Sequence, residues 1–235
     1  MIEWLMNLEW DAIVQIIIID ILLGGDNAVI IALACRNLPP KHRRQGIFWG
    51  AAGAIILRVI LITVAVALLN VPFLKLIGGV LLLWIGIKLI APPEEEGAHG
   101  KVKASDKLLS AIKTIIVADF VMSLDNVIAI AGAAEQADPS QRTGLIIFGL
   151  LVSVPFIVFG SQIILKLLDR YPIIILLGGA LLGWIAGGLI VTDPVAEAHI
   201  PQTDLVRYIA SAAGAAFVVA AAKYFAWRRR SGSAA

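Results

Sequence analysis

The chain has 235 residues, of which 60% are hydrophobic and 15% are charged, and its formal net charge is +2. A mean hydropathy of +0.91 lies far outside the range of soluble globular proteins. So small a charge argues against a nucleic-acid partner, and the single cysteine, Cys35, excludes an internal disulfide and any multi-cysteine metal site. The composition therefore predicts an all-α protein whose main partner is the lipid bilayer.

Seven apolar runs are long enough to cross a bilayer as helices, which takes about 20 residues each. In chain order they cover residues 11–34, 46–69, 71–91, 108–134, 143–165, 172–192 and 205–226. Lys and Arg cluster after every odd run, whereas the other connections carry mainly acids or no charge. Because cytoplasmic loops of membrane proteins are enriched in Lys and Arg, we expect the N-terminus outside and the C-terminus in the cytoplasm.

The two halves of the chain resemble each other. Asp20, Asp26 and Asn27 of the first run recur 99 positions later in the fourth, as Asp119, Asp125 and Asn126. Residues 72–90 and 172–190, in the third and sixth runs, are identical at 10 of 19 positions. Three spans per copy force the second copy to sit upside down, as in many transporters.

This symmetry predicts one transmembrane domain, 1–235, made of two inverted three-helix repeats and an added seventh helix. The first repeat covers about residues 11–91, the second about 108–192, and the seventh helix about 205–226. Residues 92–107 are rich in Pro, Gly and charge, which favours a solvated cytoplasmic linker between the copies.

Four aspartates lie inside the first and fourth runs, where each costs about 2.5 to 3.5 kcal/mol on insertion scales. Something must compensate for them. A separation of seven residues returns a helix to nearly the same face, so Asp20 shares a stripe with Gly24 and Asn27. In the second copy, Asp119, Ser123 and Asn126 share a stripe in the same way. The Gly24-Gly25 pair allows a local helix break, and such a break would turn the carboxylates of both Asp20 and Asp26 inward. The second copy has Ser123-Leu124 at this place, so a break there is less obvious.

Because the first and fourth runs cross the membrane in opposite directions, the order of their acids across the membrane is inverted. We therefore expect two carboxylate layers near the midplane, Asp20 with Asp125 toward the outside and Asp26 with Asp119 toward the inside. Carboxylate and amide oxygens suit Mn²⁺, Mg²⁺ or Ca²⁺ better than copper or zinc. The predicted metal ligands are Asp20, Asp26, Asn27, Asp119, Asp125 and Asn126, with Ser123, Met122, Gly24, Gly25 and Arg58 as possible supporting residues.

Two of the supporting residues have a second interpretation each. A thioether at Met122 would shift preference toward Mn²⁺, but methionine is more often packing filler. Arg58 is either a built-in counter-ion that the metal displaces, or a permanent ion pair or snorkelling side chain. The Asp-Asn pairs themselves could be polar groups that join helices, although two symmetry-related carboxylate sets favour an ion site.

The words GGDNAVIIALA (24–34) and SLDNVIAIAGAA (123–134) resemble the TerC family of integral membrane proteins, which is related to the LysE superfamily of exporters. The likeness covers residues 10 to 226, and the chain looks like the compact members of that family. It implies a multi-pass protein of the bacterial inner membrane, in a family whose members include manganese exporters. The family's acidic motif carries over as Asp20, Asp26 and Asn27, and as Asp119, Asp125 and Asn126.

We therefore expect a Mn²⁺ exporter that works by alternating access, with protons as a hypothetical counter-ion. It would have no prosthetic group and no enzyme activity, and its oligomeric state is left open. One alternative is an accessory factor that metallates or assists exported proteins. Another is an intramembrane aspartyl protease, but the matching words here are LGGD and VAD rather than the GxGD and YD of such proteases.

Overall fold

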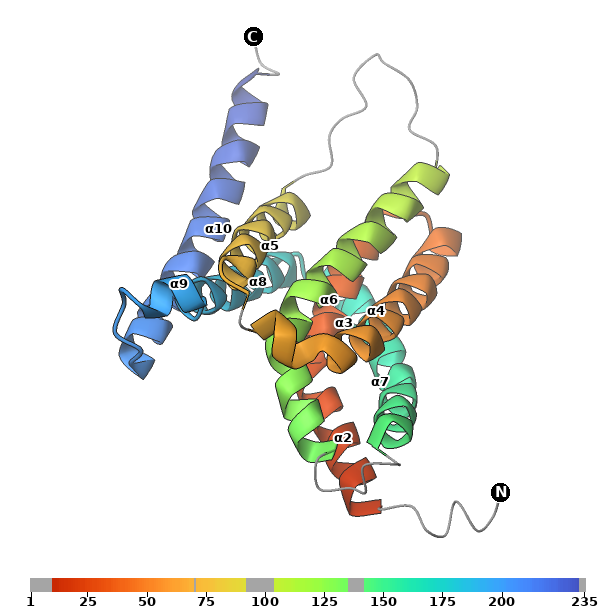
Figure 1. Ribbon diagram of the computed structural model, residues 1–235. Helices are drawn as coiled ribbons and strands as arrows, with labels where there is room; N and C mark the ends of the chain where they lie inside the picture. The colour runs from red at the N-terminus through yellow and green to blue at the C-terminus, as the bar shows by residue number, and fades with distance from the viewer. Residues whose placement is uncertain (1–9, 70, 92–103, 135–141, 233–235) are drawn as a thin grey trace.

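The computed structural model describes residues 10–69, 71–91, 104–134 and 142–232, and this part of the chain is helical without any strand. Figure 1 shows the helices packed as one irregular bundle. They are α2 (Trp10–Leu23), α3 (Gly25–Cys35), α4 (Pro40–Leu69), α5 (Leu74–Ile90), α6 (Ala104–Ala134), α7 (Arg142–Arg170), α8 (Ile173–Val191), the short α9 (Pro194–Glu197) and α10 (Asp204–Gly232).

Every predicted apolar run contains a helix, and the all-α prediction is confirmed. Among the described residues, four helices are long and apolar enough to cross a membrane: Pro40–Ile62, Thr143–Arg170, Ile173–Val191 and Asp204–Arg228. The bent pair Ile13–Leu22 and Gly25–Cys35 makes a fifth if it is one span. The third run forms α5, which has 17 residues, and the fourth forms α6 with 31. The chain is thus a multi-pass membrane protein.

Several helices extend beyond their apolar runs into the charged segments. α4 begins at Pro40 instead of residue 46, and α6 begins at Ala104, so residues 104–107 are helical and not part of the linker. The rest of the linker lies outside the described residues. A helix satisfies its own backbone hydrogen bonds, so it can continue out of the apolar layer into water without a break. The edge of an apolar run therefore marks hydrocarbon and not the end of the helix.

The helix of the first apolar run is broken in its middle. α2 ends at Leu23, Gly24 forms a turn, and α3 leaves at 47° to α2. A Cβ on Gly24 would overlap the backbone carbonyl of Asp20, so this position requires glycine. The fourth run has no such break, because α6 is continuous through Ser123 and Leu124. The sequence predicted this difference between the copies correctly.

Equivalent helices of the two halves make equivalent contacts with the opposite half. α4 of the first half packs on α6, and α7 of the second half packs on α2 and α3, while α5 packs on α8. The contacts match in detail: a Cβ on Gly50 would lie 2.5 Å from Ile115, and a Cβ on Gly149 would lie 2.5 Å from Ile16. Reciprocal contacts of this kind are what a two-fold axis between the halves produces.

The interface of α5 and α8 shows the same exchange. A Cβ on Gly79 would overlap the side chain of Ile190, and a Cβ on Gly179 would overlap that of Ile90. The glycines therefore serve close helix packing, as expected for small residues in membrane helices. α10 has no counterpart in either half and packs mainly on α8.

Candidate functional site

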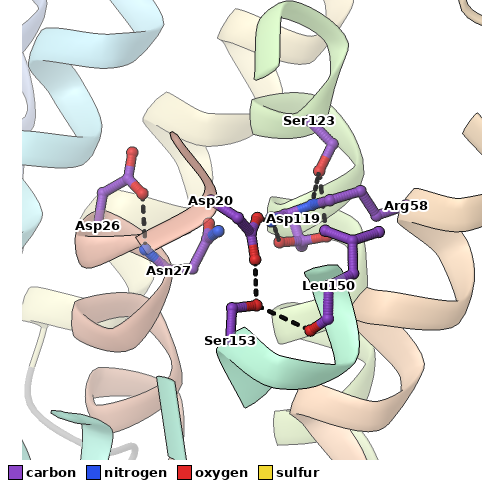
Figure 2. A network of polar contacts seen from close by, with 8 residues as sticks. All are labelled: Asp20, Asp26, Asn27, Arg58, Asp119, Ser123, Leu150 and Ser153. Atoms are coloured by element: carbon purple, nitrogen blue, oxygen red, sulfur yellow. Dashed lines mark hydrogen bonds and ion pairs between the residues drawn. The ribbon is translucent and has the colours of Figure 1, made fainter. Parts of the chain in front are cut away.

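Arg58 lies at the centre of the bundle and binds both halves of the repeat. Its side chain comes from α4 and is 2% exposed. Nη1 donates to Oδ1 of Asp20 on α2, and Nη2 donates to Oδ1 of Asp119 on α6 over 2.6 Å. Nε donates to the hydroxyl of Ser123 over 3.1 Å. Figure 2 shows the guanidinium reaching across to the two acids. Together with the serines that bind the acids, this cluster connects four helices.

A serine supports each of the two acids. Ser123 donates to Oδ2 of Asp119 over 3.2 Å, so its hydroxyl accepts from Arg58 and donates to the acid at the same time. Ser153 on α7 donates to Oδ2 of Asp20 and also lies 2.8 Å from the carbonyl oxygen of Leu150. The sequence analysis missed Ser153. Its only signal is a lone hydroxyl within an apolar span, a pattern that many packing roles share.

The charges in this cluster do not balance. Asp20 and Asp119 are both buried, at 1% and 4% exposure, and one guanidinium faces them. Two ionised carboxylates against one cation leave one negative charge in a region without bulk water. Such an excess is costly unless a proton or a further cation offsets it. The cluster is therefore built to attract positive charge.

Asn27 stands beside this cluster with an unused amide. Its side chain is 4% exposed, and neither Oδ1 nor Nδ2 has a hydrogen-bond partner among the described residues. In Figure 2 the amide of Asn27 lies between Asp20 and Asp26. A buried amide normally finds partners, so an unsatisfied one marks a position where an additional ligand would be stabilised.

Asp26 lies apart from Asp20 despite the helix break. It is half-buried, its Oδ1 accepts the backbone N–H of Asn27 over 2.8 Å, and Figure 2 shows its side chain directed away from Asp20. The break therefore brings only one carboxylate of the first copy into the centre.

The predicted separation of Asp20 and Asp119 into two different layers is wrong, because both acids bind the guanidinium of Arg58. The prediction counted helix rise from the ends of the apolar runs and assumed straight helices. A two-fold axis between the halves requires instead that equivalent residues near the axis meet. Asp20 and Asp119 are equivalent in the repeat, so they pair with each other.

The remaining predicted residues are placed as follows. Met122 is buried in an apolar cluster with Ile30 and Leu82, which favours its interpretation as packing filler. Gly24 forms the helix turn, and a Cβ on Gly25 would meet no atom within 4 Å. Asn126 is half-buried on α6.

The side chain of Asp125 lies outside the described residues. Among those that are described, no group of three or more His, Cys, Asp or Glu is arranged to hold a metal ion. Between Asp20 and Asp119, the cation in place is the guanidinium of Arg58. The six predicted ligands thus remain a prediction.

The comparison with known proteins agrees with this architecture. The family model described as "Integral membrane protein TerC family" matches residues 6–232. The "Uncharacterized membrane protein YjbE" of Bacillus subtilis (strain 168) is 40% identical over 221 residues, which cover 93% of this chain and 98% of that protein. The "UPF0053 inner membrane protein YgdQ" of Escherichia coli (strain K12) is 26% identical over 211 residues, 82% of this chain and 84% of that protein.

No solved structure matches the chain. The family model nevertheless extends over nearly all of it, and YjbE is similar from end to end. The chain therefore belongs to the TerC family of integral membrane proteins.

Proposed function

We propose that this protein exports a divalent metal ion, preferentially Mn²⁺, across the bacterial inner membrane. The observation that carries the proposal is the buried cluster of Asp20, Asp119 and Arg58, which holds more negative than positive charge beside the unsatisfied amide of Asn27. Buried ionisable groups in membrane spans mark ion pathways and proton relays. The TerC family is associated with ion transport, which supports the same class of function.

Arg58 has the position of an internal competitor for the metal. Its guanidinium lies between the two carboxylates that a dication would bridge. A metal that binds there replaces one positive charge with two, and so offsets both carboxylates once Arg58 moves away. When the metal leaves, Arg58 returns, and protons take up the charge that remains. Proton-coupled exchange follows from this charge balance.

The donor atoms set the metal preference that we propose. Asp20 and Asp119 offer carboxylate oxygens, and Asn27 offers an amide oxygen without a partner. Hard oxygen donors favour Mn²⁺, Mg²⁺ and Ca²⁺. Mg²⁺ gives up its water reluctantly, which disfavours it in a dry site. We place Asp26, Asp125 and Asn126 farther along the pathway, where the ion would enter or leave the centre.

The arrangement of helices supports alternating access. Contacts are exchanged between the halves, as inverted repeats require, and α2 and α3 form a broken span of the kind that builds transporter sites. We propose seven spans with the N-terminus outside and the C-terminus in the cytoplasm. The name of YgdQ places that relative in an inner membrane, and we propose the same location here.

We also propose that the protein is not an enzyme. In an aspartyl protease, two carboxylates share a proton to activate water. Here the guanidinium of Arg58 stands between Asp20 and Asp119, so the two carboxylates bind a cation and do not face each other directly. A factor that only hands metal to exported proteins would use the same cluster but would need a partner for transport.

Flux measurements in proteoliposomes test the proposal. The purified protein alone should carry Mn²⁺ into vesicles that contain a Mn²⁺-sensitive dye. Removing a ligand charge with Asp20→Asn or Asp119→Asn should lower the flux about 10-fold or more, in line with the loss seen when metal sites are perturbed. Asp169→Asn is the matched control, because Asp169 forms an exposed pair with Arg43 at the surface.

Further variants and ions complete the experiment. Asp26→Asn and Asp125→Asn test the proposed pathway, and excess Mg²⁺ or Ca²⁺ tests selectivity. A pH change inside the vesicles that accompanies Mn²⁺ entry would support proton coupling. Flux that is the same in wild type, Asp20→Asn and Asp119→Asn would disprove the site. Folded protein that carries no Mn²⁺ by itself would favour the accessory role.

A further inference from the structure

Two neighbouring cavities lie at the end of the bundle where α3 ends and α6 begins, away from the Arg58 cluster. The smaller has a volume of about 460 Å³ and is lined by Arg36, Arg43, Lys107 and Ala104 among others. The larger has a volume of about 1070 Å³ and runs between α3, α5, α6 and α10. Its wall is mainly apolar and includes Leu83, Trp84, Ile87, Phe217 and Phe225.

The two cavities form one continuous surface. Asn37, Leu38 and Lys107 line both of them. A molecule with a charged end and a long apolar part could therefore occupy both at once. The apolar part of this surface belongs to helices α3, α5, α6 and α10 of the bundle.

The smaller cavity is basic. Three cations and no acid line it. Arg43 already pairs with Asp169 over 2.8 Å, but Nη1 of Arg36 is buried and has no hydrogen-bond partner among the described residues. The other end of the same guanidinium is held at the carbonyl oxygen of Ala91, 3.5 Å from Nη2. A buried guanidinium N–H without an acceptor calls for an anionic ligand.

The larger cavity has the charge pattern of a lipid groove. It is lined by two lysines, Lys88 and Lys107, and by one acid, Asp106. Most of its other lining residues are apolar. Lys88 lies 5.0 Å from the centre of the Trp84 ring, an arrangement that keeps a cation beside apolar surface. Lys107, which also lines the smaller cavity, thus connects the basic lining to the apolar groove.

We propose that these cavities bind one anionic phospholipid, with its phosphate in the basic cavity and an acyl chain along the apolar groove. Basic pockets between membrane helices recognise anionic headgroups in this way. Ala104, the first described residue of α6, lines the same cavity. This inference is independent of the Arg58 cluster and of the ion that the protein moves.

Binding is tested with the purified full-length protein in detergent. Phosphatidylglycerol, phosphatidylcholine or inorganic phosphate is added, and the thermal unfolding midpoint is recorded, while native mass spectrometry counts bound lipid. Phosphatidylglycerol should raise the midpoint by several degrees more than phosphatidylcholine. Inorganic phosphate alone should have little effect, because it cannot use the apolar groove.

Matched variants locate the site. Arg36→Gln should abolish at least half of the phosphatidylglycerol effect, whereas Arg44→Gln should preserve it, because Arg44 is an exposed arginine that lines neither cavity. Ala221→Trp places a bulky side chain in the groove and should reduce lipid binding as well. Arg36→Lys keeps the charge and should keep part of the effect, which separates charge recognition from misfolding.

Each contrary result overturns the proposal. Equal shifts with both lipids would show a general detergent or bilayer effect, and a full shift with inorganic phosphate would indicate a free-anion site. Equal behaviour of Arg36→Gln and Arg44→Gln would place the lipid elsewhere. The acids Glu94, Glu95 and Glu96 follow Ala91 closely in sequence. If wild type does not bind phosphatidylglycerol but the triple glutamine variant of these acids does, the cavity is filled by the chain itself.

Discussion

Arg58 holds two acids from different halves of the chain, and no second cation pairs with either of them in the described part of the protein. Buried ion pairs of this kind contribute little net stability when they are complete, because desolvation offsets the attraction. They become very unfavourable when one partner is removed. The Arg58 side chain should therefore matter for stability as well as for ion binding.

Arg58→Gln leaves two buried carboxylates that face each other without a cation. We expect it to lower the free energy of unfolding by about 3 to 5 kcal/mol, the usual cost of breaking a buried pair. The thermal midpoint of the purified protein in detergent measures this loss. The double variant with Asp119→Asn removes one of the two charges and should recover part of the lost stability.

The exposed Arg44→Gln is the control for this experiment, and its effect should stay within about 0.5 kcal/mol. An Arg58→Gln protein as stable as wild type would mean that the acids are neutral or hydrated in the folded state. The charge balance argued above would then be incorrect.

The sequence could identify most residues of this cluster but not their partners. Asp20, Asp119, Arg58 and Ser123 all stand out because each is polar within an apolar run. Pairing depends on where the axis between the halves passes, and hydropathy does not contain that information. Asp20 and Asp119 are equivalent positions of the repeat, and this equivalence was the signal in the sequence that could have predicted their contact with the same partner.

At the scale of helices, one carboxylate fastens two elements that are distant in sequence. Asp193 follows α8, is fully buried, and caps α9 by accepting the N–H of Val195 over 2.9 Å. It also accepts the N–H groups of Phe73 and Leu76 at the start of α5, each over 3.1 Å. Phe73 is left-handed, with φ of 66°, and makes no side-chain cap of its own. Asp193 therefore provides the cap that α5 lacks.

Asp193 should make stability depend on pH. Burial opposes its charge, but the N–H groups of Val195, Leu76 and Phe73 outweigh burial and hold the pKa of Asp193 below its ordinary value. An unfolded Asp titrates near pH 3.9. The stabilisation is therefore complete above that pH and is lost as the pH falls through the lower pKa of the folded state.

Asp193→Asn tests this cap. At pH 7 it should lower the free energy of unfolding by about 1.5 to 3 kcal/mol, because hydrogen bonds to a charged acceptor are lost. The difference from wild type should shrink when the melts are repeated below about pH 4. Asp169→Asn, at an exposed ion pair, should cost less than about 1 kcal/mol. A wild-type advantage that grows in acid would contradict the assignment.

Of the two contacts that Asp193 makes, only the one with α9 has a local signal in the sequence. An Asp followed by Pro after an apolar run is a typical helix start, but α9 was not among the elements predicted from the sequence. The contact with α5 could not be predicted, because Phe73 lies 120 residues earlier in the chain. The break at Gly24 was predictable, since it depends on the local Gly24-Gly25 pair.

For the whole molecule, the proposed orientation can be measured from outside the cell. In the proposed topology Arg44 lies on the cytoplasmic side and Ala198 on the outer side, and both residues are exposed. We expect a membrane-impermeant maleimide to label Ala198→Cys in cells whose inner membrane is intact and accessible. Arg44→Cys should react only after the membrane is opened.

The wild-type protein supplies the blank for that measurement. Its single cysteine, Cys35, is fully buried and should take up little label. Labelling of Arg44→Cys in intact cells, with Ala198→Cys protected, would mean that the chain is inserted in the reverse sense. The direction of Mn²⁺ movement that we propose would then reverse as well.

The overall architecture was the most predictable part of the protein. Hydropathy located every helix run, and the repeated residues of the two halves predicted their equivalence, since both signals span many positions. Helix ends were less predictable, because α4 begins at Pro40 and α6 already includes Ala104, and both positions lie outside the apolar runs that hydropathy detects. The contact of Asp193 with α5 and the meeting of Arg36, Arg43 and Lys107 at the basic cavity depend on tertiary structure that no single segment encodes.

Arg58 occurs in only one of the two equivalent halves. Its counterpart in the other half is the apolar Phe156. Two identical halves would make the inward-open and outward-open forms of a transporter equal in energy. A single arginine would remove that degeneracy, because it lies on α4 and has no charged counterpart on α7. If the protein is the transporter that we propose, an arginine in only one half gives the cycle a preferred resting state, and replacing Arg58 should change the relative populations of the inward-open and outward-open forms.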